Sequence, residues 1–140
     1  MNPTSQPDHD DCVLVVDDDD GIREILVEIL EERGCHAVAA ANGEQAIEVL
    51  ESQSSGHRTC VILLDLMMPV MDGPTFRSEQ LKRATLASIP VVIISAFQDA
   101  ATVYAPTMKA AETLIKPLQI RDIMRVAKQF CGCEGPGLRT

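Results

Sequence analysis

The chain has 140 residues, of which 46% are apolar and 24% are charged, and this composition is typical of one globular domain. Its net charge of -9 argues against a nucleic-acid-binding surface, because such surfaces are basic. No apolar run approaches the roughly 18 residues that a membrane helix needs. The sequence therefore favours neither nucleic acid nor a membrane as a partner.

The chain contains an odd number of cysteines, and none of them has the C-x-x-C spacing of a zinc module. A chain of this length can bury a sufficient core without disulfide bonds. We therefore expect core thiols or tail thiols, and a protein of the reducing cytoplasm, since nothing at the N-terminus resembles a signal peptide. The five residues are Cys12, Cys35, Cys60, Cys131 and Cys133.

The acidic excess is confined to the first quarter of the chain. Residues 1–34 contain 11 Asp or Glu residues and two Arg residues, whereas the rest of the chain has ten acidic and ten basic residues. Residues 1–11 have too few apolar side chains to order themselves, and we expect a disordered acidic tail. Four aspartates at positions 17–20 then follow an apolar run directly. Taken alone, they fit a solvated turn that caps a helix.

Short apolar runs predict five strands, at residues 13–16, 36–41, 60–64, 90–94 and 114–115. Helical patterns separate these runs. The first extends from Ile22 to Arg33 and stops at Gly34, and the second begins with a capping box formed by Asn42 and Gln45.

Three more helices follow in the second half of the chain. One is predicted over residues 73–81, with Pro74 in its first turn. The next covers residues 99–111 but contains Pro106, which lacks a backbone donor, so we expect a short or kinked helix. The last runs over residues 119–130.

The strands are continuously apolar rather than alternating, and this pattern indicates burial on both faces of a sheet. Five strand–helix units of this kind predict an α/β, doubly wound, flavodoxin-like (βα)5 fold, with a parallel sheet covered by helices on both faces. The domain is expected at residues 12–131, between the acidic tail of residues 1–11 and a loose C-terminal tail of residues 132–140.

Polar side chains end four of the predicted strands, where an open parallel sheet binds its ligands. Clustered carboxylates favour a hard cation such as Mg²⁺. A hydroxyl and an ammonium group beside it suit phosphoryl oxygens. Each residue alone could simply end its strand, but their common position favours one site, made of Asp17, Asp18, Asp65, Ser95 and Lys116.

With the turns that follow these residues, the sequence resembles the receiver domain of two-component response regulators, in particular stand-alone, chemotaxis-regulator-like receivers. The similarity covers about residues 12–131. It rests on four blocks that occur in order: Val13–Asp18, Asp65–Pro69 continuing to Gly73, Ser95–Ala96 and Lys116–Pro117.

The resemblance implies that Asp65 accepts a phosphoryl group from the phosphohistidine of a histidine kinase or phosphotransfer protein. Asp18, Asp65 and the backbone carbonyl of Met67 would bind Mg²⁺ directly, and Asp17 would act mainly through a bound water. The protein would then catalyse only its own phosphorylation and dephosphorylation and would not act as an enzyme.

The resemblance also implies the switch. Lys116 would neutralise the charge on Asp65 and then on its phosphoryl group, and the bond from Lys116 to Pro117 would be cis. Ser95 would move to hydrogen-bond a phosphoryl oxygen. The signal would reach a downstream protein through the face formed by the fourth helix, the fifth strand and the fifth helix.

Some positions depart from the family pattern. Thr113 replaces an aromatic residue that usually swings inward, so the usual coupling cannot operate in that form. Tyr104 is a weak candidate for a substitute, and a partly exposed surface tyrosine fits its position better. Asp20 stands where many receivers have proline, and we expect it to cap the first helix. Met67 and Phe97 lack groups that could orient water, which predicts a long-lived acyl phosphate.

Two alternatives remain. Asp18, Asp20 and Gly21 fit the D-x-D-G opening of a haloacid-dehalogenase-like phosphatase that uses Mg²⁺. That family needs an acidic motif beyond the lysine, but only Asp122 and Glu134 follow it, and Asp65 is left unexplained. A pseudo-receiver, which keeps the fold as a binding module without phosphorylation, is the other alternative.

Overall fold

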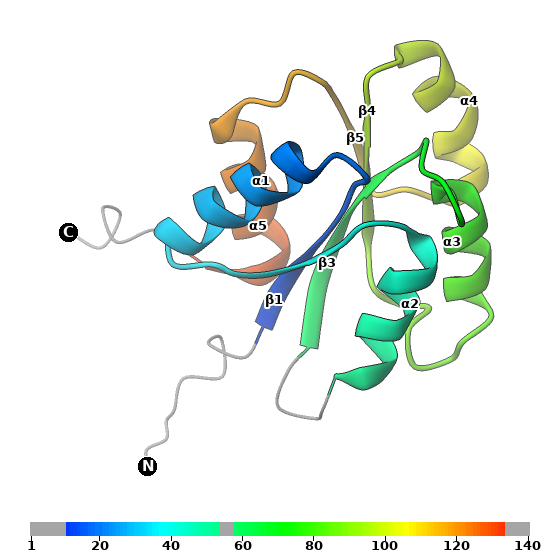
Figure 1. The fold of residues 1–140 in the computed structure, drawn as a ribbon, viewed down its shortest axis with the longest axis horizontal. Helices are drawn as coiled ribbons and strands as arrows, with labels where there is room; N and C mark the ends of the chain where they lie inside the picture. Colours follow the sequence, from blue (N-terminus) through cyan, green and yellow to red (C-terminus); the bar gives the residue numbers. More distant parts are fainter. Residues whose placement is uncertain (1–10, 54–57, 134–140) are drawn as a thin grey trace.

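The computed structural model describes residues 11–53 and 58–133, and it has five strands that alternate with five helices (Figure 1). The predicted tails lie outside the described residues, except for Asp11, which begins the first strand, and Gly132 and Cys133. The strands are β1 (Asp11–Val16), β2 (His36–Ala40), β3 (Arg58–Asp65), β4 (Val91–Ser95) and β5 (Glu112–Ile115). The helices are α1 (Asp20–Glu32), α2 (Gly43–Ser52), α3 (Gly73–Leu81), α4 (Gln98–Met108) and α5 (Ile120–Cys131).

All strand pairs are parallel, and the strand order is β2-β1-β3-β4-β5. The predicted α/β fold is therefore confirmed. The central strands are almost wholly buried, which agrees with their continuous apolar runs. The strand β5 starts two residues before its predicted range. The apolar pattern missed Glu112 and Thr113, because both are polar and only half-buried at the edge of the sheet.

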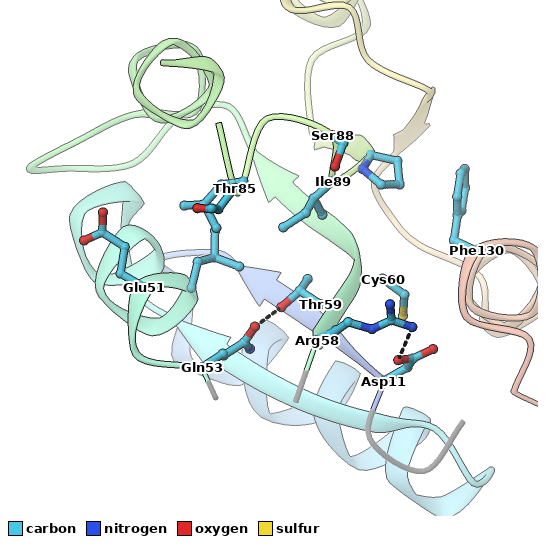
Figure 2. Close-up of a pocket in the computed structure, with 13 residues that line it drawn as sticks. Asp11, Glu51, Gln53, Arg58, Thr59, Cys60, Thr85, Ser88, Ile89 and Phe130 are labelled. Carbon is cyan, nitrogen blue, oxygen red and sulfur yellow. Dashed lines mark hydrogen bonds and ion pairs between the residues drawn. The ribbon is translucent and has the colours of Figure 1, made fainter. Parts of the chain in front are cut away.

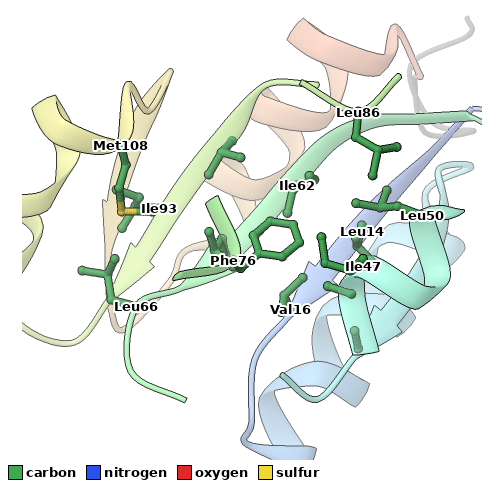
Figure 3. Packing of buried hydrophobic residues seen from close by; sticks show 14 of the residues in the cluster. Leu14, Val16, Ile47, Leu50, Ile62, Leu66, Phe76, Leu86, Ile93 and Met108 are labelled. Carbon is green, nitrogen blue, oxygen red and sulfur yellow. The ribbon is translucent and has the colours of Figure 1, made fainter. Parts of the chain in front are cut away.

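The helices cover both faces of this sheet (Figure 1). One apolar cluster joins the sheet to α2, α3 and α4, with the ring of Phe76 fully buried among Leu14, Ile62 and Ile93 (Figure 3). A second cluster joins the other face to α1 and α5. No helix of the described part of the chain is both long enough and apolar enough to span a bilayer.

The prediction that Asp20 caps α1 is wrong by one residue, because the cap is Asp19. The side chain of Asp19 accepts a hydrogen bond from the Ile22 amide at 3.0 Å, whereas Asp20 lies in the first turn and forms an ion pair with Arg23. The reason is geometric. A cap needs an extended backbone and a side chain that reaches the amide three residues later, and Asp19 satisfies both conditions.

Other helix signals are in place. Asn42 caps α2 by accepting from the Gln45 amide at 2.9 Å, and the Gln45 side chain accepts from the Ala41 amide at 2.7 Å. Gly34 follows α1 with a φ of 86°, a left-handed conformation that favours glycine.

The helix α4 passes through Pro106 and ends two residues later, three residues before its predicted end. Its end is held by a buried arginine of α3. Arg77 Nε donates to the Met108 carbonyl at 2.8 Å, and Nη2 donates to the Lys109 carbonyl at 3.2 Å. Nη1 donates to Gln80 Oε1 at 2.8 Å and to the Ile89 carbonyl at 3.3 Å.

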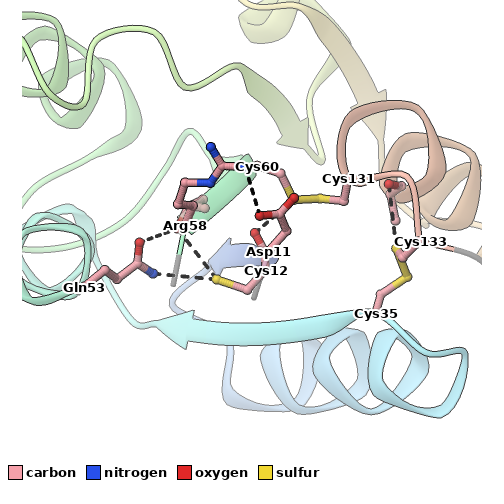
Figure 4. Close-up of a disulfide and its surroundings, with 10 residues drawn as sticks. Asp11, Cys12, Cys35, Gln53, Arg58, Cys60, Cys131 and Cys133 are labelled. Carbon is pink, nitrogen blue, oxygen red and sulfur yellow. Dashed lines mark hydrogen bonds and ion pairs between the residues drawn. A yellow bond between two sulfur atoms is a disulfide. The ribbon is translucent and has the colours of Figure 1, made fainter. Parts of the chain in front are cut away.

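Four cysteines are joined in pairs, Cys35 with Cys133 and Cys60 with Cys131 (Figure 4). Their Cα atoms lie 5.5 and 5.3 Å apart, within the usual range for disulfides. The expectation of unpaired core and tail thiols is therefore wrong for these four residues. The pairs span 98 and 71 residues, so no local spacing could indicate them. Cys12 is a buried free thiol.

Candidate functional site

Three of the predicted site residues meet at the carboxyl edge of the sheet. The strands β1 and β3 lie side by side where the strand order reverses, and a ligand is expected at such a point. Asp17 and Asp18 follow β1, and Asp65 ends β3. One carboxylate oxygen of each lies within 4.8 Å of the others. Asp17 and Asp65 are buried, and Asp18 is exposed to solvent.

Lys116 supplies the cation of this site from the loop after β5. Its Nζ lies 3.0 Å from Asp17 Oδ2 and 3.6 Å from Asp65 Oδ2. Burial alone would lower the pKa of Lys116, but the hydrogen bond to Asp17 and the charges of Asp65 and Asp17 raise it above its usual value. The peptide bond from Lys116 to Pro117 is cis, as the resemblance implies.

The carboxyl group of Asp65 is hard to ionise in the metal-free site. Burial and the negative charge of Asp17 raise its pKa from 3.8 to about 6, although Lys116 and a hydrogen bond from the Met67 backbone act in the opposite direction. Additional positive charge beside Asp65 would therefore stabilise its reactive, ionised form.

The donor set fits Mg²⁺. All three groups are carboxylates, which this ion prefers as ligands. Asp17 Oδ2 is buried and lies 3.0 Å from Lys116 Nζ, so a ligand or its water shell would share this oxygen with the ammonium group. The Met67 side chain is 61% exposed and points away from the core. The role of its backbone carbonyl as a ligand stays a prediction.

Ser95 ends β4 and is buried, but its hydroxyl group is engaged within its own loop. Ser95 Oγ donates to the Phe97 carbonyl at 3.1 Å and accepts from the Phe97 amide at 3.0 Å. The structure thus places Ser95 at the predicted strand end without a hydrogen bond to the carboxylates. To reach a group on Asp65, the hydroxyl must exchange these two hydrogen bonds for a new one.

Two contacts that position Asp17 were not foreseen from the sequence. The Asp19 amide donates to Asp17 Oδ1 at 2.9 Å, and Arg23 Nη1 donates to the Asp17 carbonyl at 2.8 Å. These groups orient the carboxylate and the backbone beside it. The position of Arg23 on α1, three residues beyond the acidic run, was the available signal.

The backbone of Gly73 lies close against the backbone of Asp65 and Leu66. A Cβ atom at this position would lie 2.6 Å from the Asp65 carbonyl oxygen and 2.9 Å from the Leu66 Cα. A side chain here would displace the backbone that carries Asp65. Gly73 belongs to the second family block and begins the predicted helix, but no sequence pattern indicated the close approach of its backbone to Asp65.

The departures from the family pattern lie around the site. Thr113 is half-buried in β5. Tyr104 is 38% exposed on α4, which confirms the interpretation as a partly exposed surface residue. Phe97 and Met67 are largely exposed beside the carboxyl edge, and neither carries a group that could activate water.

Residues 13–128 match the response regulator receiver domain family. The chain belongs to this family. The receiver is 32% identical over 121 residues to sporulation initiation phosphotransferase F of Bacillus subtilis, and the alignment covers 84% of this chain and 91% of the relative. Several other curated relatives are longer, and the receiver spans about half of their length or less.

Solved structures agree with this assignment. The response regulator TrrA of Thermotoga maritima, solved in complex with Mg²⁺-BeF, is 26% identical with a TM-score of 0.72, covering 86% of this chain and 98% of that one. The chemotaxis protein CheY4 of Vibrio cholerae is 24% identical with a TM-score of 0.75, covering 84% of this chain and 96% of that one, and it supports the fold.

The comparisons give no support to a phosphatase or to a pseudo-receiver. The side chain of Asp20, which would be the second aspartate of the phosphatase motif, is 81% exposed and is paired with Arg23. Asp20 is not part of the carboxylate cluster. The chain is thus a receiver domain of two-component signal transduction.

Proposed function

We propose that the receiver accepts a phosphoryl group on Asp65 from the phosphohistidine of a histidine kinase or phosphotransfer protein. A carboxylate oxygen of Asp65 forms a bond to phosphorus as the bond between phosphorus and the imidazole nitrogen breaks. The released imidazole takes a proton from solvent, and Asp65 carries an acyl phosphate. The observation that supports this proposal is the cluster of Asp17, Asp18, Asp65 and Lys116 at the carboxyl edge.

The main barrier to this transfer is the repulsion between a carboxylate and an anionic phosphoryl group. Asp18, Asp65 and the Met67 carbonyl would hold Mg²⁺ directly, and Asp17 would hold it through water. Bound there, the ion supplies positive charge that offsets the repulsion and binds phosphoryl oxygens. Lys116, with its Nζ 3.6 Å from Asp65 Oδ2, would contact the phosphoryl group once it is attached.

Ser95 would transmit the effect of phosphorylation from Asp65 to the loop before α4. Its hydroxyl group would leave the two hydrogen bonds with Phe97 and donate to a phosphoryl oxygen, which moves the loop that leads into α4. The face formed by α4, β5 and α5 would bind a downstream protein. Val103 and Tyr104 on α4 and Ile115 on β5 present exposed apolar surface for such a contact.

The functional unit in this proposal is residues 12–131. It acts in the cytoplasm, catalyses only its own phosphorylation and dephosphorylation, and has its effect through protein contacts. Nucleic acid and membranes are not among the partners that we propose for this chain, because its net charge is -9.

Intact mass spectrometry tests the proposal after incubation with Mg²⁺ and a small-molecule phosphodonor. We expect the addition of one phosphoryl group, its loss with EDTA, and its loss in Asp65→Asn. Asp20→Asn is the matched control, because it removes a nearby aspartate that is exposed and outside the cluster. If neither the small donor nor a phosphorylated histidine phosphotransfer domain modifies the wild-type protein, the proposal is wrong.

A further inference from the structure

The two cysteine pairs lie at the amino edge of the sheet, at the opposite end of the strands from Asp65. Cys35 directly precedes β2, and Cys60 is the third residue of β3. Both pair with cysteines at the end of α5 (Figure 4). Because β1 lies between β2 and β3, the two links fasten the end of one helix to the start of β2 and to β3, on the two sides of β1.

A single backbone feature directs the two cysteines of α5 to different strands. Cys131 is the last residue of the helix, and Gly132 follows it with a φ of 67°. This left-handed residue turns the chain away from the helix axis. Cys131 therefore faces β3, whereas Cys133, two residues later, faces the start of β2.

Each pair joins a buried cysteine to a half-buried one. Cys35 and Cys131 are buried, with 2% and 7% of their surfaces exposed, whereas Cys60 and Cys133 are only half-buried. Cys60 also lines an open cavity of about 840 Å³, together with the charged side chains of Asp11 and Arg58 (Figure 2). We therefore expect a small oxidant or an attacking thiolate to reach the half-buried cysteine of each pair first, and attack of a thiolate on a disulfide sulfur is how disulfides are exchanged.

The fold does not need these bonds to hold α5. Ile123, Val126 and Ala127 bury the inner face of the helix against the sheet. Cys35 and Cys131 belong to the same apolar cluster and would fill the same space as thiols. Loss of the covalent links would thus release only the last turn of α5 and the residues after it, while the rest of the helix stays packed.

We propose that Cys35 with Cys133, and Cys60 with Cys131, are sites of reversible oxidation that together lock the end of α5 to the sheet. With hydrogen peroxide as oxidant, one thiol loses its proton and the thiolate attacks a peroxide oxygen, which yields a sulfenic acid and hydroxide; the hydroxide takes up the released proton and becomes water. The second thiol displaces water from it, so two thiols and one peroxide give a disulfide and two waters. A dithiol reverses the step by attack on Cys60 or Cys133, and it becomes a disulfide itself.

Thiol counting on the full chain tests this proposal. When the chain is unfolded in denaturant for alkylation, we expect five alkylated cysteines after reduction and removal of the reductant. After treatment of the folded protein with two equivalents of peroxide we expect one, Cys12, with the two pairs identified by peptide mapping. A dithiol added to the folded oxidised protein should restore all five. Cys12→Ser is the matched control. Cys12 is buried and belongs to neither pair, so its removal should leave both pairs intact.

Hydrogen exchange tests the lock itself. In the oxidised protein, the amides of residues 128–133 should exchange more slowly than in the reduced protein, and those of α3 should not change. The melting temperature should rise by about 10 °C or more, since each link closes a long loop. Cys133→Ser removes one link from its more exposed side and should retain only the pair of Cys60 with Cys131.

Several results would overturn the proposal. Five alkylated thiols after peroxide, or different partners on mapping, would show that these pairs do not form. Resistance of the folded oxidised protein to dithiols would make the links permanent rather than reversible. Stoichiometric zinc on the four reduced cysteines would show that a metal, and not oxidation, fixes the end of α5.

Discussion

Replacing Asp65 by Asn should make the metal-free protein more stable at pH 7, although it removes the proposed phosphoryl acceptor. The ionised side chain is buried beside Asp17, and its attraction to Lys116 does not compensate for this position. Asparagine has nearly the same shape and carries no charge. The variant should therefore keep the fold and lose the repulsion.

The pKa of Asp65 gives the size of this effect. Burial and the charge of Asp17 raise it from 3.8 to about 6. At about 1.4 kcal/mol per pKa unit, the ionised form costs the folded state about 3 kcal/mol. Because a raised pKa favours folding only while the group is protonated, this contribution is complete below pH 3.8 and is lost as the pH rises through about 6. The stability gain of Asp65→Asn should be about 1–3 kcal/mol at pH 7.

Urea unfolding in EDTA at pH 7 and at pH 4 measures this gain. We expect Asp65→Asn to have a higher free energy of unfolding than the wild type at pH 7. At pH 4 the two values should match closely, because the Asp65 carboxyl group of the folded wild type is then also uncharged. Mg²⁺ should reduce the difference in free energy of unfolding between the two proteins at pH 7, because it binds and stabilises the native wild type. Asp20→Asn serves as the control and should change little. An Asn variant that is less stable at pH 7, or a gain that persists unchanged at pH 4, would refute the reasoning.

Three further predictions concern the site and its supports. Calorimetric Mg²⁺ affinity should fall steadily below pH 6, because protonation of Asp65 competes with the metal, and a flat profile would contradict the raised pKa. Exchange of Met67 and Phe97 for polar residues should shorten the lifetime of the acyl phosphate in a mass-spectrometric time course; an unchanged lifetime would disprove their role. Arg77→Leu should cost about 3 kcal/mol in urea unfolding, since it leaves buried carbonyls without a donor. Arg125 on α5 forms an ion pair with Glu112 at the surface. Arg125→Leu breaks this pair and should cost less than about 1 kcal/mol, and equal losses for the two variants would count against the importance of burial.

The fold and the carboxylate cluster could be predicted because both follow from local patterns. The buried strands appear as uninterrupted apolar runs, and the residue after each run necessarily lies at the carboxyl edge of a parallel sheet. Asp17 and Asp65 therefore had to meet once the topology was known, because β1 and β3 are neighbours. Lys116 follows β5, which β4 separates from β3, and it reaches the two carboxylates through its long side chain. The strand order alone decides which of them are neighbours.

The features that escaped prediction depend on side-chain direction or on distant parts of the chain. The orientation of the Ser95 hydroxyl is a choice between rotamers, and no sequence pattern specifies it. The choice between Asp19 and Asp20 as the cap depends on one backbone angle. The partners of Cys35 and Cys60 lie 98 and 71 residues away, where only the assembled fold brings them close.

The hydrogen bonds from Arg77 to the end of α4 have a consequence for how the exposed surface of α4 can diverge in sequence. Its donors bind main-chain oxygens of Met108, Lys109 and Ile89, and every amino acid provides that oxygen. Side chains on the outer side of α4 can therefore be exchanged for those that suit a new partner, while the end of the helix keeps its anchor. The position of α4 and the side chains that α4 presents to a partner can therefore change independently.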